Sequence, residues 1–211
     1  MRPNVIDLDV ADANTAGLAD DLTGAGPWDS GDFVTTAPTD GLAHQLSFTS
    51  AANLSAITLT VVGTDADGKV LSEDVTGPNA NTVESTGYFK TLTSITAGST
   101  LGANTLDVGW VDEVVSQTYP IDRLSTEQAN IQVDVTGTID FTVQELWANV
   151  YDYDKPQQDA PWLDIAALAD KTADTASQAT TGATAIRIMI NSYSSGAELQ
   201  MYTNQVSSGN L

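Results

Sequence analysis

The sequence predicts an all-β protein made of two small antiparallel β-sandwich or barrel-like domains with an extended N-terminal arm. Three observations predict this fold: apolar and polar residues alternate at period two in several segments, turn residues separate those segments, and a 3.6-residue apolar period is scarce. The chain of 211 residues is long enough for two such domains. We place the arm at residues 1–40, the first β-domain at 41–117 and the second at 118–211.

The N-terminal 40 residues are rich in Asp, Gly and Pro, with Val5-Ile6-Asp7-Leu8 as their strand-like piece. We expect an extended arm or irregular cap here rather than a core element. Such an arm can order on a partner, with Val5, Ile6 and Leu8 as apolar contacts and Trp28, beside Pro27, as the anchor.

The first domain contains a predicted hairpin. Ile57, Leu59 and Val61 alternate with threonines, Asp65-Ala66-Asp67-Gly68 supplies a turn, and residues 70–75 return. The turn begins like a calcium loop but lacks that motif's further carboxylates, so we interpret it as a hairpin turn. Further strands are expected at 45–50, 88–95 and 105–110.

The second domain shows the clearest alternation, at residues 131–136 and 139–144. The short link Thr136-Gly137-Thr138 predicts that these two strands form a hairpin. Two later strands, at 185–191 and 198–203, are joined by a Ser-Ser-Gly turn. The segment Trp162–Lys171 follows Pro161 and fits either a short helix or an ordered loop.

The charge balance excludes several classes of partner. Seven Lys and Arg residues oppose 28 Asp and Glu residues, a net charge of −21, so there are no clustered cations for nucleic acid or anionic membranes. No segment approaches the roughly 20 apolar residues that span a bilayer, and no N-terminal apolar signal region is present. Mutual repulsion of the carboxylates is screened by salt, which predicts a protein adapted to a saline or hypersaline medium.

No residue pattern identifies an enzyme. The chain has no cysteine, and its single histidine, His44, lies at an expected strand start without a Gly-x-Ser-x-Gly motif. Paired carboxylates are available everywhere in so acidic a chain and therefore select no site, which leaves an acid-dependent glycoside hydrolase as a minor alternative. We assign no catalytic, cofactor-binding or metal-ligating residue, although the acidic surface could hold structural Na⁺, K⁺, Mg²⁺ or Ca²⁺ ions.

The aromatic residues supply the remaining candidates. Trp110 and Trp147 close alternating apolar rows and are expected to pack inward. Trp28 and Trp162 follow prolines in loops, where they could anchor a neighbouring subunit or stack on sugars in a carbohydrate-binding module. Tyr151 and Tyr153 lie in an Asp-rich segment that fits a subunit contact, a cation site or a solvated loop.

Two parts of the sequence resemble structural proteins of tailed bacterial and archaeal viruses. The resembling segments are G-T-D-A-D-G-K at 63–69, S-E-D-V-T-G-P-N at 72–79, Y-F-K-T-L-T-S-I at 88–95 and A-I-R-I-M-I-N-S at 185–192. The acidic bias departs from usual bacteriophage composition and would fit a haloarchaeal virus. The resemblance implies a compact β-module that has no active site and binds in many copies to a lattice or ring.

These observations together predict a virion protein that works by binding. The expected role is a capsid decoration or cement subunit on the major capsid protein lattice, acting as a homo-oligomer, for which a trimer is one arrangement. A tail-side adaptor, nozzle or fibre-anchoring ring is the alternative within the virus, and a carbohydrate-binding module is the alternative outside that class. Partners are expected to be other virion components, without nucleic acid or membrane.

Overall fold

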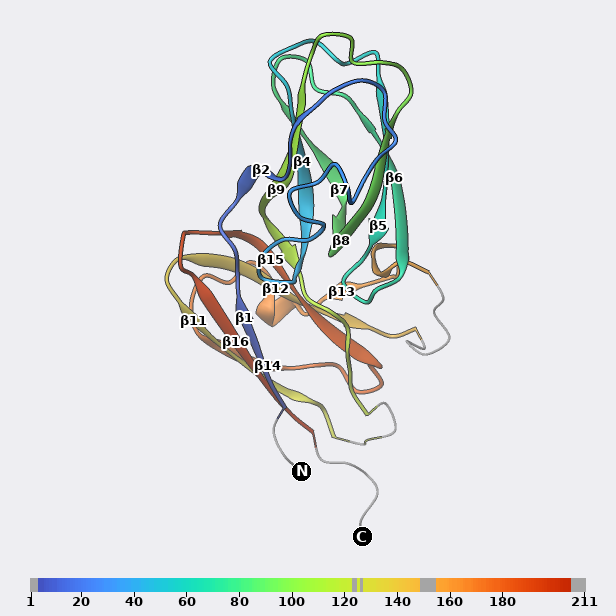
Figure 1. Ribbon diagram of the computed structural model, residues 1–211. Coiled ribbons are helices and arrows are strands. Elements are labelled where there is room, and N and C mark those ends of the chain that lie inside the picture. The colour runs from blue at the N-terminus through green and yellow to red at the C-terminus, as the bar shows by residue number, and fades with distance from the viewer. Residues whose placement is uncertain (1–3, 123–124, 126, 149–154, 206–211) are drawn as a thin grey trace. The chain divides into compact units, whose positions relative to one another are not determined.

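The computed structural model describes residues 4–122, 125, 127–148 and 155–205, and these residues form an all-β protein (Figure 1). The chain divides into two compact units: unit 1 contains residues 1–10 and 115–211, and unit 2 contains residues 11–114. The expected domain boundary after residue 117 lies near the observed division at 114–115. The first 40 residues differ from the expectation, because they are shared between the units instead of forming a separate arm.

Unit 1 contains two antiparallel sheets, which we call A and B. Sheet A has the strand order β1-β16-β11-β14, and in sheet B the order is β13-β12-β15, with β10 also paired to β15. The bounds of its strands are β1 (Asn4–Asp9), β10 (Tyr119–Pro120), β11 (Asn130–Thr136), β12 (Ile139–Leu146), β13 (Leu163–Asp164), β14 (Thr175–Gln178), β15 (Ala185–Tyr193) and β16 (Glu198–Asn204).

The predicted hairpin of residues 131–136 and 139–144 is wrong. Strand β11 pairs with β14 and β16 in sheet A, whereas β12 pairs with β13 and β15 in sheet B. The link at 136–138 therefore carries the chain from one sheet to the other, and the turn at 194–196 carries it back between β15 and β16. Alternation shows that each strand buries one face, but it does not show which sheet the strand belongs to. Two strands with this pattern can pair within one sheet, or they can lie in two sheets whose apolar faces pack against each other.

Strand β1 belongs to the core of unit 1. Its six residues pair in unbroken antiparallel register with β16, next to which it lies in Figure 1. Ile6 and Leu8 are buried, with 5% and 3% of their surface exposed, while Val5 points outward and is 52% exposed. Of the three arm contacts expected here, only Val5 is accessible, because the period-two alternation of this segment already buries the other two.

Unit 2 is also built from two antiparallel sheets, C and D. Sheet C has the order β3-β8-β5-β6, and sheet D has the order β9-β4-β7 with β2 paired to β9. The bounds are β2 (Asn14–Leu22), β3 (Trp28–Asp29), β4 (Ala43–Thr49), β5 (Thr58–Thr64), β6 (Val70–Thr76), β7 (Thr82–Phe89), β8 (Thr91–Ala97) and β9 (Leu106–Val115).

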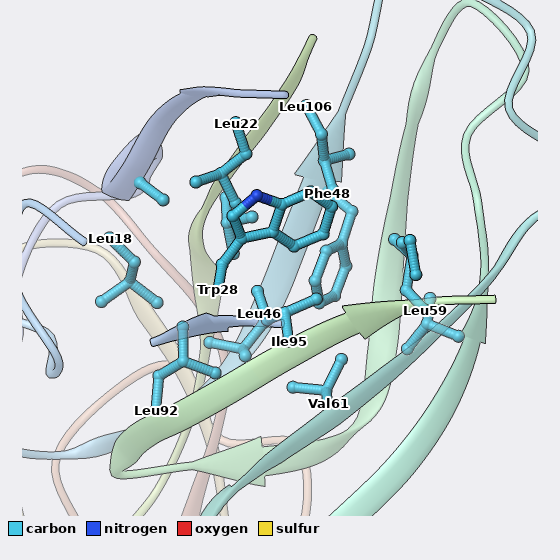
Figure 2. Packing of buried hydrophobic residues seen from close by; sticks show 14 of the residues in the cluster. Leu18, Leu22, Trp28, Leu46, Phe48, Leu59, Val61, Leu92, Ile95 and Leu106 are labelled. Atoms are coloured by element: carbon cyan, nitrogen blue, oxygen red, sulfur yellow. The ribbon is translucent and has the colours of Figure 1, made fainter. Parts of the chain in front are cut away.

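The core of unit 2 contains Trp28. Its side chain lies among Leu22, Leu46 and Ile95 in Figure 2, is 5% exposed, and donates from Nε1 to the carbonyl oxygen of Thr23 at 2.9 Å. Trp28 is therefore a core residue, and its predicted role as a subunit anchor or sugar platform is wrong. Neighbouring Pro and Gly residues indicated a loop, but the short strand β3 carries the indole inward.

Strand β2 approaches β9 closely at a glycine. A Cβ atom on Gly109 would lie 1.7 Å from the carbonyl oxygen of Asn14, so any side chain there collides with the backbone of β2. The pairing of β2 with β9 is irregular, with register shifts between Asn14 and Ala19 and between Ala19 and Leu22. This irregularity, together with weak β-formers such as Ala, Gly and Asp, explains why the sequence did not indicate a strand here.

The hairpin predicted in the first domain is confirmed as β5–β6, paired without interruption from Thr58–Thr76 to Thr64–Val70. The side chain of Asp65, 2% exposed, accepts hydrogen bonds from the N–H groups of Asp67 and Lys69, and Gly68 has φ +77°. These bonds shape the turn. The single strand expected at 88–95 is instead two strands, β7 in sheet D and β8 in sheet C.

The segment at 162–171 contains the two-residue strand β13 and the 3₁₀ turn Ala166–Leu168. The ordered-loop interpretation therefore fits better than the helix. Ile165 and Leu168 face inward with 8% and 0% exposure, so the turn fastens to the unit through these two side chains.

Candidate functional site

The outward face of sheet A carries a groove of about 390 Å³ across β14, β11 and β16. Because residues alternate along a strand, Ile131 and Val133 point into the core, and their neighbours on β11 point outward. We define the amide groove by six outward residues of these strands: Asn130, Gln132, Ala176, Gln178, Tyr202 and Asn204.

Strand register arranges the amide groove in rows. Asn130 pairs with Gln178 on one side and Asn204 on the other, which makes a row of three amides. Gln132 lies between Ala176 and Tyr202 in the next row. Val5 of β1 pairs with Tyr202 and extends this second row.

Hydrogen bonds fix the orientation of the amides. Gln178 donates from Nε2 to Oδ1 of Asn130 at 2.7 Å, and Gln132 donates from Nε2 to Oδ1 of Asp134 at 2.8 Å. The hydroxyl of Tyr202 donates to Oε1 of Gln200 at 2.8 Å. These contacts hold the side chains that they join and leave further donors and acceptors of those side chains available.

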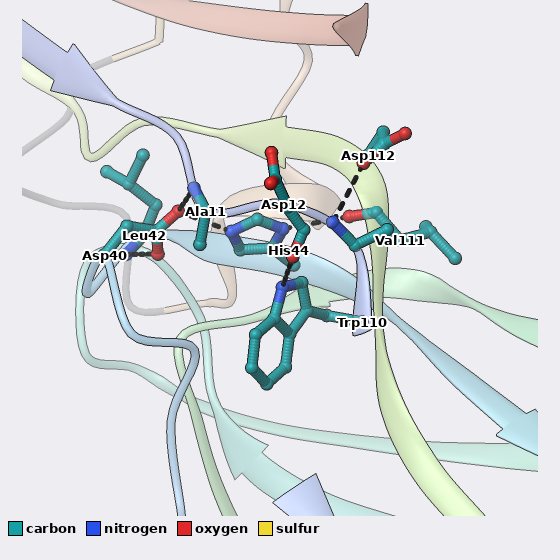
Figure 3. A network of polar contacts seen from close by, with 9 residues as sticks. Ala11, Asp12, Asp40, Leu42, His44, Trp110, Val111 and Asp112 are labelled. Carbon is teal, nitrogen blue, oxygen red and sulfur yellow. Dashed lines mark hydrogen bonds and ion pairs between the residues drawn. The ribbon is translucent and has the colours of Figure 1, made fainter. Parts of the chain in front are cut away.

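His44 occupies a buried polar network in unit 2 and is 0% exposed (Figure 3). Its Nδ1 lies 3.0 Å from the carbonyl oxygen of Val111, and its Nε2 lies 2.8 Å from Oδ2 of Asp40. Both ring nitrogens therefore lie within hydrogen-bonding distance of an oxygen acceptor. His44 therefore links three segments of the fold and has no free nitrogen for general-base chemistry.

The carboxylate of Asp40 also receives backbone N–H groups, from Ala11 at 2.8 Å and Leu42 at 2.9 Å. Burial alone raises the pKa of Asp40, but the hydrogen bond and charge of His44, with these two N–H groups, more than offset it. The pKa of Asp40 is thus lowered from its ordinary value. The residue ties the start of unit 2 to β4.

Trp162 is half-buried in unit 1 and lies against a buried cation. The guanidinium carbon of Arg187 lies 4.4 Å from the centre of the Trp162 ring. Arg187 also donates to Oε1 of Gln144 at 2.8 Å and to Oε1 of Gln157 at 2.9 Å. The indole of Trp162 is held by this stack and by a bond from Nε1 to the carbonyl of Gln157 at 3.0 Å.

The other aromatic predictions have mixed outcomes. Trp110 packs inward as expected, with 4% exposure, and donates to the carbonyl of Asp12 at 3.0 Å. Trp147 was expected inside but is 50% exposed, because it stands beyond the last residue of β12. Tyr151 and Tyr153 lie outside the described residues.

Sequence reasoning missed Glu145, a buried carboxylate at the end of β12 with 6% exposure. It accepts the N–H and hydroxyl of Thr180, both at 2.7 Å, and the indole N–H of Trp147 at 3.0 Å. A single Glu in an alternating strand gives no sign of this role, because its partners are distant in the sequence. Its contacts fasten the segment between β14 and β15.

The carboxylates of Asp20, Asp21 and Asp107 in unit 2 have oxygen atoms within 4.8 Å of one another. Asp20 and Asp21 are exposed, and the N–H of Asp21 donates to Oδ1 of Asp107 at 2.9 Å. The cluster is a local concentration of negative charge.

Within the part of the chain that the structure describes, no helix has the length and apolar character needed to cross a membrane. No protein-family model matches this sequence, and no curated protein matches it.

Proposed function

We propose that this protein is a non-enzymatic structural subunit of a tailed-virus particle, which decorates or cements the capsid by binding the lattice of its major capsid protein. Its segments that resemble virion proteins supply strands in both units: β5 to β8 in unit 2 and β15 in unit 1. Antiparallel β-sheet units with buried polar networks suit a role in which function comes from binding.

The observation that carries this proposal is the pair of open edges of sheet A. Among the residues that the structure describes, β1 pairs only with β16, and β14 pairs only with β11. Each outer edge offers backbone N–H and C=O groups that a neighbouring chain can pair with. The six-residue ladder of β1 is regular, and exposed Val5 adds an apolar contact beside that edge.

The acidic surface sets the conditions under which the subunit assembles. Copies that each carry a net charge of −21 repel one another unless cations screen or bridge them. The proposal therefore includes assembly at high salt, as a homo-oligomer within the virion.

Quantitative mass spectrometry of purified particles of the encoding virus tests the proposal. Hundreds of copies, on the order expected for a repeated shell lattice, support decoration, whereas about six or twelve copies would assign the protein to a tail-side ring. Absence of the protein from purified particles would overturn both roles.

A further inference from the structure

We propose that the amide groove of sheet A binds a neutral oligosaccharide. This inference goes beyond the structural role proposed above and does not depend on it. It relies on the outward side chains of β14, β11 and β16 and on the adjacent Val5 of β1, all within unit 1.

The rows of the groove match the two kinds of surface on a sugar ring. Ala176, the ring of Tyr202 and Val5 provide apolar surface in one row, against which the C–H face of a pyranose can pack. The small side chain of Ala176 leaves space above β14. A chain lying along this row crosses the strands and passes alongside the row of three amides.

The amides offer the mixed hydrogen bonding that hydroxyl groups require. Asn130 accepts from Gln178 through Oδ1, which leaves its Nδ2 as a donor and Oε1 of Gln178 as an acceptor. Oε1 of Gln132 is likewise an acceptor, because its Nε2 is used for Asp134. Since each sugar hydroxyl both donates and accepts, an alternation of these groups is complementary to it.

Charge selects against acidic sugars. The residues that line the groove include no cation. The adjacent row contains Asp7 and Asp134, which lie on either side of Gln200. The negative charge of a uronic acid or sulfated sugar would be repelled by these carboxylates, with no positive charge to compensate. The hydroxyl groups of a neutral sugar can instead donate hydrogen bonds to them.

The dimensions also fit an oligosaccharide. A volume of about 390 Å³ falls within the range of small-ligand sites. Neighbouring strands lie roughly 4.8 Å apart, which is close to the length of one pyranose residue. Side chains in one row across three adjacent strands can therefore contact successive sugar residues of an oligosaccharide that lies across the strands.

The test is isothermal titration calorimetry on the full chain with neutral oligosaccharides of glucose, mannose and galactose, and with an oligogalacturonide as the anionic comparison. We expect at least one neutral oligosaccharide to bind. Tyr202→Ala and Gln132→Ala should each weaken that binding roughly tenfold, because they remove the stacking surface and the central amide. Tyr202→Phe should retain most of the affinity.

Gln45→Ala is the matched control, since Gln45 is a strand glutamine of β4 in unit 2 and should leave affinity unchanged. Thermal melts of each variant establish that it is folded. The proposal is overturned by failure of all the neutral oligosaccharides to bind, by affinity that is unchanged in both Gln132→Ala and Tyr202→Ala, or by equal affinity for the oligogalacturonide. Presence or absence in virus particles tests the structural role separately.

Discussion

The backbone N–H of Ser194 donates to the carbonyl oxygen of Thr138 at 2.9 Å, and this bond joins the two corners at which unit 1 changes sheets. One corner follows β11 and the other follows β15, and the N–H of Thr138 also donates to Oγ of Ser194 at 3.4 Å, so contacts between these two residues link the crossings. Gly137 lies inside the first corner with φ +82°, and a Cβ there would lie 3.3 Å from the Cα of Ala197 in the second.

Gly137→Ala should therefore destabilise unit 1. We expect a loss of roughly 1–3 kcal/mol in the free energy of unfolding, because a left-handed backbone and a close contact are both penalised. Gly182→Ala is the control: its φ is +97°, but a Cβ added there would have no atom within 4 Å, so only the backbone cost applies. Urea denaturation of both variants measures the difference, and equal losses would contradict a packing role for the corner.

The pair of Asp40 and His44 should make unit 2 sensitive to acid. Because the pKa of Asp40 is lowered in the folded state, its contribution to stability is present above the unfolded value of about 4 and is lost as the pH falls through the lower folded value. Asp40→Asn should cost roughly 2–3 kcal/mol at neutral pH and flatten this acid dependence.

Denaturation midpoints measured from neutral to acidic pH check the role of Asp40. Glu84→Gln, at an exposed position on β7, serves as the control and should change stability by less than about 0.5 kcal/mol. If Asp40→Asn leaves both the stability and its acid dependence unchanged, the buried pair does not stabilise the fold.

Gly109→Ala should detach β2 from β9. The added methyl group would overlap the carbonyl oxygen of Asn14, so the backbone must move, at a cost of roughly 3 kcal/mol or more. Hydrogen exchange should show that protection falls most in residues 14–22, while β5 and β6 retain theirs. Uniform loss of protection throughout unit 2 would show instead that β2 does not open separately.

Stability should rise with salt. With a net charge of −21, we expect the melting temperature to increase between about 0.05 M and 1 M NaCl, because the Debye length shrinks from more than 10 Å to ~3 Å. Asp20→Asn removes one charge from the cluster with Asp21 and Asp107 and should reduce this dependence. Equal melting temperatures at the two NaCl concentrations would contradict the inference of a high-salt environment.

The sequence predicted the fold class because period-two alternation is a local property of each strand. It could not predict which strand pairs with which: β11 and β12 have matching patterns and a short link, yet β11 pairs with β16, more than sixty residues away in the chain. The inward side chain of Trp28 was missed for a similar reason, since its neighbours Leu46 and Ile95 come from other strands.

Sequence reasoning missed the candidate groove on similar grounds. Asn130, Gln178 and Asn204 are ordinary polar residues until the strand register brings them into one row. Sequence reasoning offered Trp28 and Trp162 as subunit anchors, with sugar stacking as the alternative, but Trp28 is buried and Trp162 is stacked with Arg187. The signal that could have found the groove is the outward repeat of Asn130 and Gln132 on a strand whose other face is apolar.

Unit 2 is one continuous stretch of chain, residues 11–114, placed between two pieces of unit 1. During translation, the ribosome therefore delivers all of unit 2 before it makes β16, the only strand with which β1 pairs among the described residues. Strand β1 therefore cannot form its native pairing until β16 has been made, late in synthesis. The nascent chain thus acquires its two units in a fixed order, and unit 1 is completed last.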